Sequence, residues 1–398
     1  MTKPVRTAVV GLGGRGIYLA GQYDRRSHPG FELCAVCDLD PVRFRQIEAR
    51  YGDSVTYHTD LHEMLVKADV DAVLVATNDP HHVEPTIAAL RAGKHVLVEK
   101  PLCQTVADAR RIIDEARQAT GIFMIGFELR EVSVFRQLKE FAEAGRIGDI
   151  KIGHAFDNVS VGGDYFFHDP ARQRGFYRTL LLQKASHSLD LLNWLMGSHP
   201  VKVYGIGGLD FYGGKEDPDL RCRECTRAAE CPYRVHHEGF TMDYGAVIEK
   251  PDYCVWSKAM DLNDNSELCI SYANGGKATF HECHFTPDYT REFWFVGTRG
   301  KIYGYYDNPG RFLIRLEYSH SRERRTEEFK PPYEGGSHGG GDDNLRNEFY
   351  RRIMEHDPPR EAVESAYYST ALAICAEQSI ETGQAVVIPS LGMASTGA

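Results

Sequence analysis

Residues 7–16 read TAVVGLGGRG, and this stretch decides the fold of the first part of the chain. The apolar run before the glycines predicts a buried strand, and the run IYLAGQY after them predicts a helix. A loop of this kind turns tightly, lets the backbone approach a pyrophosphate and points helix N-terminal N–H groups at it. The loop contains the pattern GxGxxG, and we take as its cofactor-binding residues Gly11, Gly13, Gly14, Arg15 and Gly16.

A carboxylate near the end of the next predicted strand completes this dinucleotide signature. The strand FELCAVCDLD, at 31–40, carries Asp38 near its end. A carboxylate at that place accepts hydrogen bonds from a ribose diol and repels a 2′-phosphate. We therefore expect NAD, in preference to NADP, as the cofactor.

Strand and helix patterns then alternate to about residue 127, which is typical of a doubly wound parallel sheet. The run DAVLVAT at 71–77 is apolar almost throughout, as expected of a strand that is buried on both faces. We assign residues 1–127 to a Rossmann domain that binds NAD. The fold class expected from this half is α/β.

The remaining residues, 128–398, predict a second α/β domain. Short β runs broken by Gly, Asn and Pro predict a large, mainly antiparallel open sheet. One clear helix pattern lies at 185–197, and two more, at 344–356 and 364–383, are expected to pack back on the Rossmann domain.

Composition and charge exclude several classes of protein. The net charge of −10 over 398 residues repels a polyphosphate backbone, so no nucleic-acid partner is expected. No run of about 18 apolar residues predicts a membrane span. The start, MTKPVRTAVV, has no apolar segment closed by a cleavage site, so a cytoplasmic location is expected.

Cysteines gather in a predicted insertion at about 213–256. The spacing is C-x2-C-x5-C with a fourth cysteine further on, and the residues are Cys222, Cys225, Cys231 and Cys254. Four thiolates suit a structural zinc, which would have no open position for catalysis. His236 or His237 could replace one thiol. Reduced or disulfide-bonded cysteines are the alternative, because only one CxxC pair is present.

Two short motifs, each following an apolar strand, carry a resemblance to a known family. TNDPHH at 77–82 and EKP at 99–101, together with GLGGRG, resemble the Gfo/Idh/MocA family of oxidoreductases. The resemblance continues through GFELR at 126–130, KASHSLDLLNWLMG at 184–197 and GTRGKI at 297–302. It implies a Rossmann domain, NAD(P) and an open sheet that often serves as an oligomer interface, so a homodimer or homotetramer is expected.

The resemblance also implies roles for individual residues. Lys100 would lie by the nicotinamide, and the nucleotide would be lined by Thr77, Asn78, His82 and Glu99. Asn78 stands where the family commonly has proline.

Oxidation of a secondary alcohol needs a base for the hydroxyl proton, and Lys100 and His187 are the candidates. His187 and Asp190 share one helix face and fit the last two positions of the family pattern DxGxHxxD, whose Gly is Ala185 here, and Asp190 is expected to contact the substrate. The first Asp of that pattern is replaced here by Gln183, which supplies no charge. Lys184, next to it, is expected in the substrate pocket, where its cation would orient a hydroxyl or an acidic substituent.

Further substrate contacts are expected from the segment before that helix and from a Gly-rich loop at 335–341. Arginines bind carboxylates or sulfonates with two donors, although a solvated basic loop is the alternative. The loop would add His338 and Asp342, from the same subunit or from a neighbouring one. The candidates in the first segment are Tyr165, Arg172, Arg174 and Arg178.

These observations favour an NAD-dependent dehydrogenase or reductase acting on a secondary hydroxyl or ketone of a sugar, glycoside or cyclitol. An NAD-dependent glycosidase is the alternative: it oxidises a hydroxyl, eliminates the aglycone, adds water and returns the hydride. An anionic sugar is compatible with either reaction. A non-catalytic nucleotide-binding regulator is a third class, but it would be expected to have lost Lys100 or His187.

Overall fold

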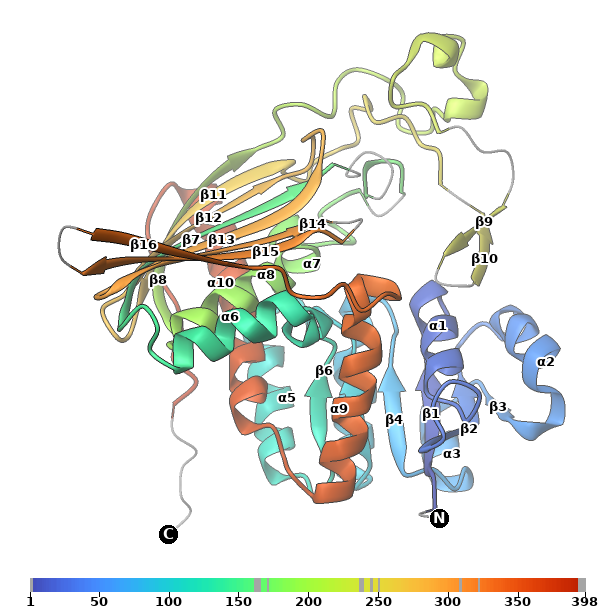
Figure 1. Ribbon diagram of the computed structural model, residues 1–398. Helices are drawn as coiled ribbons and strands as arrows, with labels where there is room; N and C mark the ends of the chain where they lie inside the picture. Colours follow the sequence, from blue (N-terminus) through green and yellow to red (C-terminus); the bar gives the residue numbers. More distant parts are fainter. Residues whose placement is uncertain are drawn as a thin grey trace.

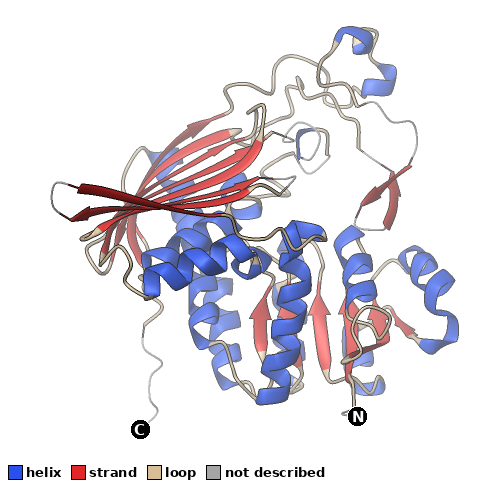
Figure 2. Cartoon of the chain, viewed as in Figure 1, coloured by secondary structure: helices blue, strands red, loops and turns tan. Residues whose placement is uncertain are grey.

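The computed structural model describes part of the chain in full detail. The described residues are 3–160, 166–169, 172–235, 240–243, 246–249, 251–307, 310–320 and 323–392. They form two layered regions, each built on one large sheet (Figures 1 and 2).

The first region is a six-stranded parallel sheet with the strand order β3-β2-β1-β4-β5-β6. Its strands are β1 (Val5–Val10), β2 (Phe31–Cys37), β3 (Thr56–His58), β4 (Ala72–Val75), β5 (His95–Val98) and β6 (Phe123–Ile125). Every residue of β4 is buried, because helices cover both faces of a parallel sheet. The order is that of a Rossmann fold, whose switch point lies between β1 and β4.

Helices alternate with these strands. They are α1 (Gly14–Gln22), α2 (Arg45–Tyr51), α3 (Leu61–Lys67), α4 (Val83–Arg91) and α5 (Val106–Gln118). The hydroxyl of Thr105 accepts a hydrogen bond from the Asp108 N–H and so caps the start of α5. The doubly wound sheet expected from the sequence is confirmed.

The second region is built on a nine-stranded sheet with the order β16-β15-β14-β13-β7-β12-β11-β8-β17. Its pairs are antiparallel except for β7 and β12. The strands are β7 (Ile150–Val159), β8 (Pro200–Gly208), β11 (Asn265–Tyr272), β12 (Lys277–Cys283), β13 (Tyr289–Gly297), β14 (Gly300–Asp307), β15 (Phe312–His320), β16 (Glu323–Phe329) and β17 (Val386–Val387). The large, mainly antiparallel sheet predicted from the sequence is confirmed. A separate hairpin joins β9 (Phe240–Asp243) and β10 (Ala246–Glu249).

Helices lie between this sheet and the Rossmann region (Figure 1). They are α6 (Ser133–Glu143), α7 (Leu180–Gln183), α8 (Ser186–Met196) and α10 (Arg360–Thr382), while α9 (Gly341–Glu355) lies on the face of the Rossmann sheet. Helix α10 contacts α5 and β6 on one side and α8 and β8 on the other. Helix α9 buries Leu345, Phe349 and Ile353 in a cluster shared with β1 and β2. None of the described helices is long and apolar enough to cross a membrane.

Candidate active site

The glycine loop joins β1 to α1 at the carboxyl edge of the Rossmann sheet. Gly11 has a φ of +90°, and a Cβ there would lie 2.6 Å from the Thr77 backbone nitrogen. A Cβ on Gly16 would lie 1.8 Å from the Gly11 carbonyl oxygen, so the loop closes tightly on itself. At Gly13, in contrast, a Cβ would meet nothing within 4 Å. This open backbone leads into the N-terminus of α1, which suits a phosphate group.

Asp38 is fixed beside this loop. Its carboxylate accepts hydrogen bonds from the backbone N–H groups of Leu12 (2.7 Å) and Asp40 (2.9 Å). These bonds tie the end of β2 to the turn after β1. The arrangement is suited to hold a carboxylate at the place where a ribose would meet the loop.

A cavity of about 850 Å³ opens at this edge of the sheet. The residues that line it from the Rossmann region include Gly13, Gly14, Arg15, Thr77, Asn78, Asp79, His82, Glu99 and Lys100. Those that line it from the second region include Gln183, Lys184, His187, Tyr289, Tyr306, Arg311 and His338. Most of the predicted nucleotide residues and the two predicted catalytic residues therefore line one cavity, whereas Gly11, Gly16 and Asp38 are not among the described residues that line it.

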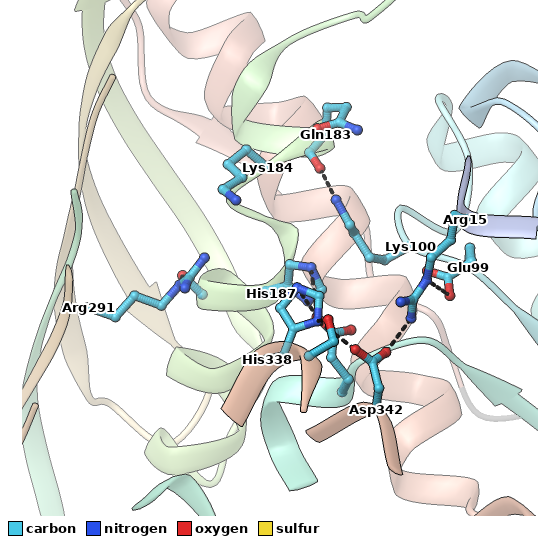
Figure 3. Close-up of polar contacts among 12 residues, drawn as sticks. Arg15, Glu99, Lys100, Gln183, Lys184, His187, Arg291, His338 and Asp342 are labelled. Atoms are coloured by element: carbon cyan, nitrogen blue, oxygen red, sulfur yellow. Dashed lines mark hydrogen bonds and ion pairs between the residues drawn. The ribbon is translucent and has the colours of Figure 1, made fainter. Parts of the chain in front are cut away.

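Lys100 reaches across from the Rossmann region. Its Nζ donates to the Gln183 carbonyl oxygen at 2.6 Å. Burial, and next the positive charge of Lys184, lower the pKa of Lys100. Its ammonium group is thereby held at the seam between the two halves of the cavity, at the amino end of α8 (Figure 3).

His187 lies in the first turn of α8 and is almost fully buried. Its Nε2 faces the Glu128 carboxylate at 3.4 Å, while its buried Nδ1 has no hydrogen-bond partner among the described residues. Burial lowers the pKa of His187 well below the usual value, and the cations Lys100 and Arg291 add to the effect. The imidazole is therefore neutral at neutral pH.

A chain of charged groups links the two sides of the cavity below His187 (Figure 3). His338 lies 3.5 Å from Glu128 through Nε2 and 2.8 Å from Asp342 through Nδ1. Asp342 also pairs with Arg15, and Arg15 Nε donates to Glu99 at 2.7 Å. Burial raises the pKa of Glu128. Burial opposes the charged form of His338 as well, but Glu128 and Asp342 outweigh it and raise the pKa of His338.

The Gly-rich loop delivers His338 to this chain. His338 itself has a φ of 49°, and Gly339 and Gly340 follow with φ values of 65° and 98°. Such positive values favour glycine, so the glycine run permits the sharp turn into α9. The loop thus brings a titratable side chain from far along the sequence to the wall of the cavity.

A second cluster surrounds the hydroxyl of Tyr289 on the wall formed by the large sheet. Lys184 Nζ and the Arg291 guanidinium approach that hydroxyl at 2.8 and 3.2 Å. Arg291, which is fully buried, also lies 3.4 Å from the Asp157 carboxylate on β7. Lys184 thus lines the cavity, and the Tyr289 hydroxyl is one of its polar contacts there.

Several predicted substrate residues lie elsewhere. None of the three arginines is among the described residues that line the cavity. Arg172 donates to the carbonyls of Cys254 and Pro218, Arg174 pairs with Glu377 and Glu381, and Arg178 donates to the Gln104 carbonyl. The guanidinium groups of these arginines therefore bind the insertion and the neighbouring loops.

Asp190 is also placed away from the cavity wall. It is fully buried and forms two hydrogen bonds with Arg130, at 2.6 and 2.8 Å. This ion pair fixes α8 against the turn at 128–131, so Asp190 has a structural partner. Tyr165 lies outside the described residues.

The cysteines of the insertion line a separate cavity of about 250 Å³, which includes Cys222, Cys225, Cys231 and Cys254. Each of them is a free thiol. Among the described residues, no group of three or more His, Cys, Asp or Glu side chains is arranged to hold a metal ion. His236 and His237 lie outside the described part of the chain. The predicted zinc site therefore receives no support from the structure.

Sequence reasoning missed Glu128, Tyr289 and Arg291. A weak signal was available for the last two, since residues two apart on a strand point to one face and would have placed them together. Glu128 has no such signal, because it lies in an irregular turn after β6 whose direction is set by contacts with α8 and α9.

Comparisons with known proteins agree with this arrangement. Residues 5–127 match the family described as "Oxidoreductase family, NAD-binding Rossmann fold", and residues 135–303 match the "GFO/IDH/MocA C-terminal domain". The chain is 24% identical over 386 residues to "Putative oxidoreductase YteT" of Bacillus subtilis, a match that covers 86% of this chain and 88% of that protein.

A second relative and a solved structure add to these matches. An "Inositol 2-dehydrogenase" of Salmonella paratyphi B is 31% identical over 202 residues, which is 50% of this chain and 57% of that enzyme. The structure "Levoglucosan dehydrogenase, complex with NADH and L-sorbose" superposes with a TM-score of 0.74, 17% identity and coverage of 98% of this chain and 100% of the other. At that identity the likeness shows the fold alone.

Proposed function

Because this chain belongs to the Gfo/Idh/MocA family of oxidoreductases, we propose that it transfers a hydride between NAD and a secondary hydroxyl or ketone of a sugar, glycoside or cyclitol. One observation carries the proposal. The glycine loop, Lys100 and His187 meet in a single cavity at the carboxyl edge of the Rossmann sheet, where ligands of such sheets bind. The names of two relatives, inositol 2-dehydrogenase and 1,5-anhydro-D-fructose reductase, support the substrate class.

The residues present fit a dinucleotide. The open backbone at Gly13 and Gly14, together with the N-terminus of α1, would hold the pyrophosphate, and Asp38 would hold the ribose diol. When bound, the nicotinamide supplies the acceptor or donor of the hydride. Asp38 supports a preference for NAD, because its carboxylate would repel a 2′-phosphate. The nucleotide would be lined further by Thr77, Asn78, His82 and Glu99.

Lys100 and His187 would make different hydrogen bonds to the substrate at the reacting carbon. The ammonium of Lys100 donates hydrogen bonds, so it would orient the substrate oxygen and stabilise negative charge on it. His187 is neutral, and its unpartnered Nδ1 can accept a hydrogen bond from a substrate hydroxyl.

An NAD-dependent glycosidase is the second candidate. Oxidation of a hydroxyl acidifies a neighbouring C–H, which permits elimination of the aglycone before water is added and the hydride returned. This series of reaction steps needs more acids and bases than a simple oxidation does. The pair Glu128 and His338, beside His187 in the same cavity, supports it, and Lys184 would suit an anionic sugar.

We also propose that the chain forms a homodimer or homotetramer through the open face of the large sheet. Exposed apolar side chains lie there on three strands: Ile152, Phe156, Tyr204, Ile206 and Val296. Contiguous apolar surface of this kind marks protein contacts. An Ile206→Glu variant should reduce the mass measured by light scattering, with Val66→Glu, an exposed apolar position on α3 of the Rossmann region, as the control. An unchanged mass for Ile206→Glu would contradict the choice of this face.

The reaction class is tested by incubating the protein with NAD and a panel of sugars, glycosides and cyclitols. NADH absorbance and released aglycone are followed together. Stoichiometric NADH is the result expected of a dehydrogenase. Aglycone release that requires NAD but accumulates no NADH would establish the glycosidase instead, and no reaction together with no NADH binding would contradict both.

A further inference from the structure

The hydroxyl of Tyr289 is a polar group of the cavity that the proposed roles of Lys100 and His187 leave unused. Tyr289 is the first residue of β13 and lines the cavity wall. Two cationic groups donate to its single oxygen: Lys184 Nζ at 2.8 Å and the Arg291 guanidinium at 3.2 Å. Both cations also lie over its ring, with 5.0 Å from Lys184 Nζ and 5.2 Å from the Arg291 guanidinium carbon to the ring centroid.

The titratable groups around this hydroxyl come from three strands and from the end of α7. Lys184 follows α7, Arg291 lies two residues along β13, Asp157 lies on β7 and Tyr306 on β14. Asp157 is the opposing charge, and it lies 3.4 Å from Arg291. Tyr306 is a neutral neighbour whose ring also contacts the Arg291 guanidinium. Two cations therefore face the oxygen directly, while the carboxylate acts from behind Arg291.

This arrangement favours the ionised form of the phenol. An oxygen that accepts hydrogen bonds from two cations is stabilised as the anion, because each donor is strongest toward a negative acceptor. Burial alone raises the pKa of Tyr289, but Arg291 and Lys184 outweigh burial and the Asp157 charge and lower the pKa of Tyr289 to about 7. Tyr306 provides the contrast, since burial raises its pKa.

His187 is less suited to take a proton from an alcohol. The low pKa of His187 follows from burial and from the cations beside it, so its imidazolium form is disfavoured in this cavity. A base is most effective when its pKa lies near the working pH. Of these two cavity groups, Tyr289 meets that condition and His187 does not.

We infer that Tyr289, held between Lys184 and Arg291, is a catalytic residue that takes the hydroxyl proton of the substrate as a phenolate and returns it in the reverse direction. The inference rests on the proposed function. In oxidation, the substrate O–H bond breaks and its proton goes to the Tyr289 oxygen. The C–H bond also breaks, and its hydrogen leaves with both bonding electrons as a hydride, for which the bound nicotinamide is the acceptor. The C=O bond forms from the electrons of the broken O–H bond. Lys184 and Arg291 are positioning residues for the phenolate.

An ultraviolet difference titration of the whole protein tests the ionisation without any substrate. Wild type should contain a tyrosine that ionises near pH 7, and Tyr289→Phe should lose that transition. Tyr306→Phe, the matched control, should keep it. Lys184→Met should move the transition to higher pH, because one of the two cations is removed. Identical titrations for wild type and Tyr289→Phe would overturn the inference, whatever the panel of sugars shows.

Activity provides the second arm, using a sugar that the panel has identified. Tyr289→Phe should lower kcat/KM by on the order of 100-fold or more, the range of general base catalysis, and should remove the acid limb of its pH profile near 7. NADH binding, followed by fluorescence, should stay as in wild type. An unchanged limb in Tyr289→Phe would overturn the catalytic role. If wild type itself does not bind NADH, that result would count against the proposed function instead. The ultraviolet titration would still decide whether Tyr289 ionises near pH 7.

Discussion

The glycine-loop end of the cavity combines bare backbone at Gly13 and Gly14 with side chains such as Arg15 and Glu99, whereas the end formed by α8 and the large sheet is lined by the side chains of Lys184, His187 and Tyr289. At the first end, the absence of side chains at Gly11, Gly13 and Gly16 creates the site. At the second end, Lys184, His187 and Tyr289 create it through charge and hydrogen bonds. Under the proposed function, the shape of the glycine loop would therefore decide what binds at one end. The protonation of Lys184, His187 and Tyr289 would decide what reacts at the other end.

The largest effect is expected from adding a side chain to the glycine loop. In Gly16→Ala, the new Cβ would start 1.8 Å from the Gly11 carbonyl oxygen, a clash between backbone atoms that no rotamer relieves. We expect a loss of about 3 kcal/mol or more in the free energy of unfolding and no measurable NADH binding. Denaturant unfolding and fluorescence titration measure the two effects.

Gly13→Ala is the matched control, since its Cβ would meet nothing within 4 Å. Its unfolding free energy should stay within about 1 kcal/mol of wild type. A stable Gly16→Ala variant that binds NADH normally would contradict the view that backbone shape forms this end.

Removing a charge from the seam should leave shape intact and affect the reaction. Lys100→Met should lower kcat by on the order of 1000-fold, because the ammonium that orients the substrate oxygen is lost, while the affinity for NADH should change little. Lys94→Met is the control, since Lys94 Nζ donates to the Val70 carbonyl in the Rossmann region. Near-normal turnover in Lys100→Met would show that the charged end works without this lysine.

The chain of charges below His187 offers a smaller and more specific test. Glu128 and Asp342 favour the imidazolium of His338, so the pKa of His338 is raised in the folded state. This interaction stabilises the fold below the ordinary histidine pKa of about 6.5, and its contribution is lost as pH rises through the higher folded pKa.

Glu128→Gln removes one of the two carboxylates and should lower the pKa of His338. The measurement is a titration of the histidine ring signals by NMR, with His338→Asn used to assign the signal. Glu128→Asp, which keeps the charge, should move the pKa less than Glu128→Gln does. An unmoved His338 titration in Glu128→Gln would show that the two groups are not electrostatically linked.

The smallest expected effect returns to the glycine-loop end and concerns Asp38. Asp38→Ala should raise the ratio of NADP to NAD use by about tenfold, because the repulsion of a 2′-phosphate and the bonds to the ribose are both removed. Steady-state kinetics with both cofactors measure the ratio, and Asp40→Ala serves as the neighbouring control. Unchanged discrimination in Asp38→Ala would contradict the role proposed for that carboxylate.

The same contrast explains which parts of the molecule can be predicted from its sequence. The strand, the glycines and Asp38 lie within one short stretch, so the doubly wound fold class and the position of the loop follow from local pattern. Tyr289 reaches the cavity through sheet register, for which the sequence holds only a weak signal. His338 is a candidate from the Gly-rich loop, but its contacts with Glu128 and Asp342 depend on loop geometry that the sequence does not record. Glu128 is similar, because its turn is placed by contacts with α8 and α9.

The arginines show the opposite error. Arg172 and Arg174 suit an anionic substrate by residue type, but a guanidinium satisfies backbone carbonyls equally well when an insertion folds over it. Arg172 is buried by such carbonyls, and Arg174 is paired with the carboxylates of α10. Sequence reveals the donor but not which acceptor will be nearest.

Helix α10 has a consequence for the order in which the molecule is assembled. It buries Ala366, Tyr367 and Leu372 between α5 of the Rossmann region and α8 and β8 of the second region. Synthesis proceeds from the N-terminus, so the ribosome delivers the Rossmann sheet long before the helix that covers one side of it. Until α10 emerges, that apolar side stays available to chaperones or to other nascent chains. The two regions are therefore expected to complete their folding together.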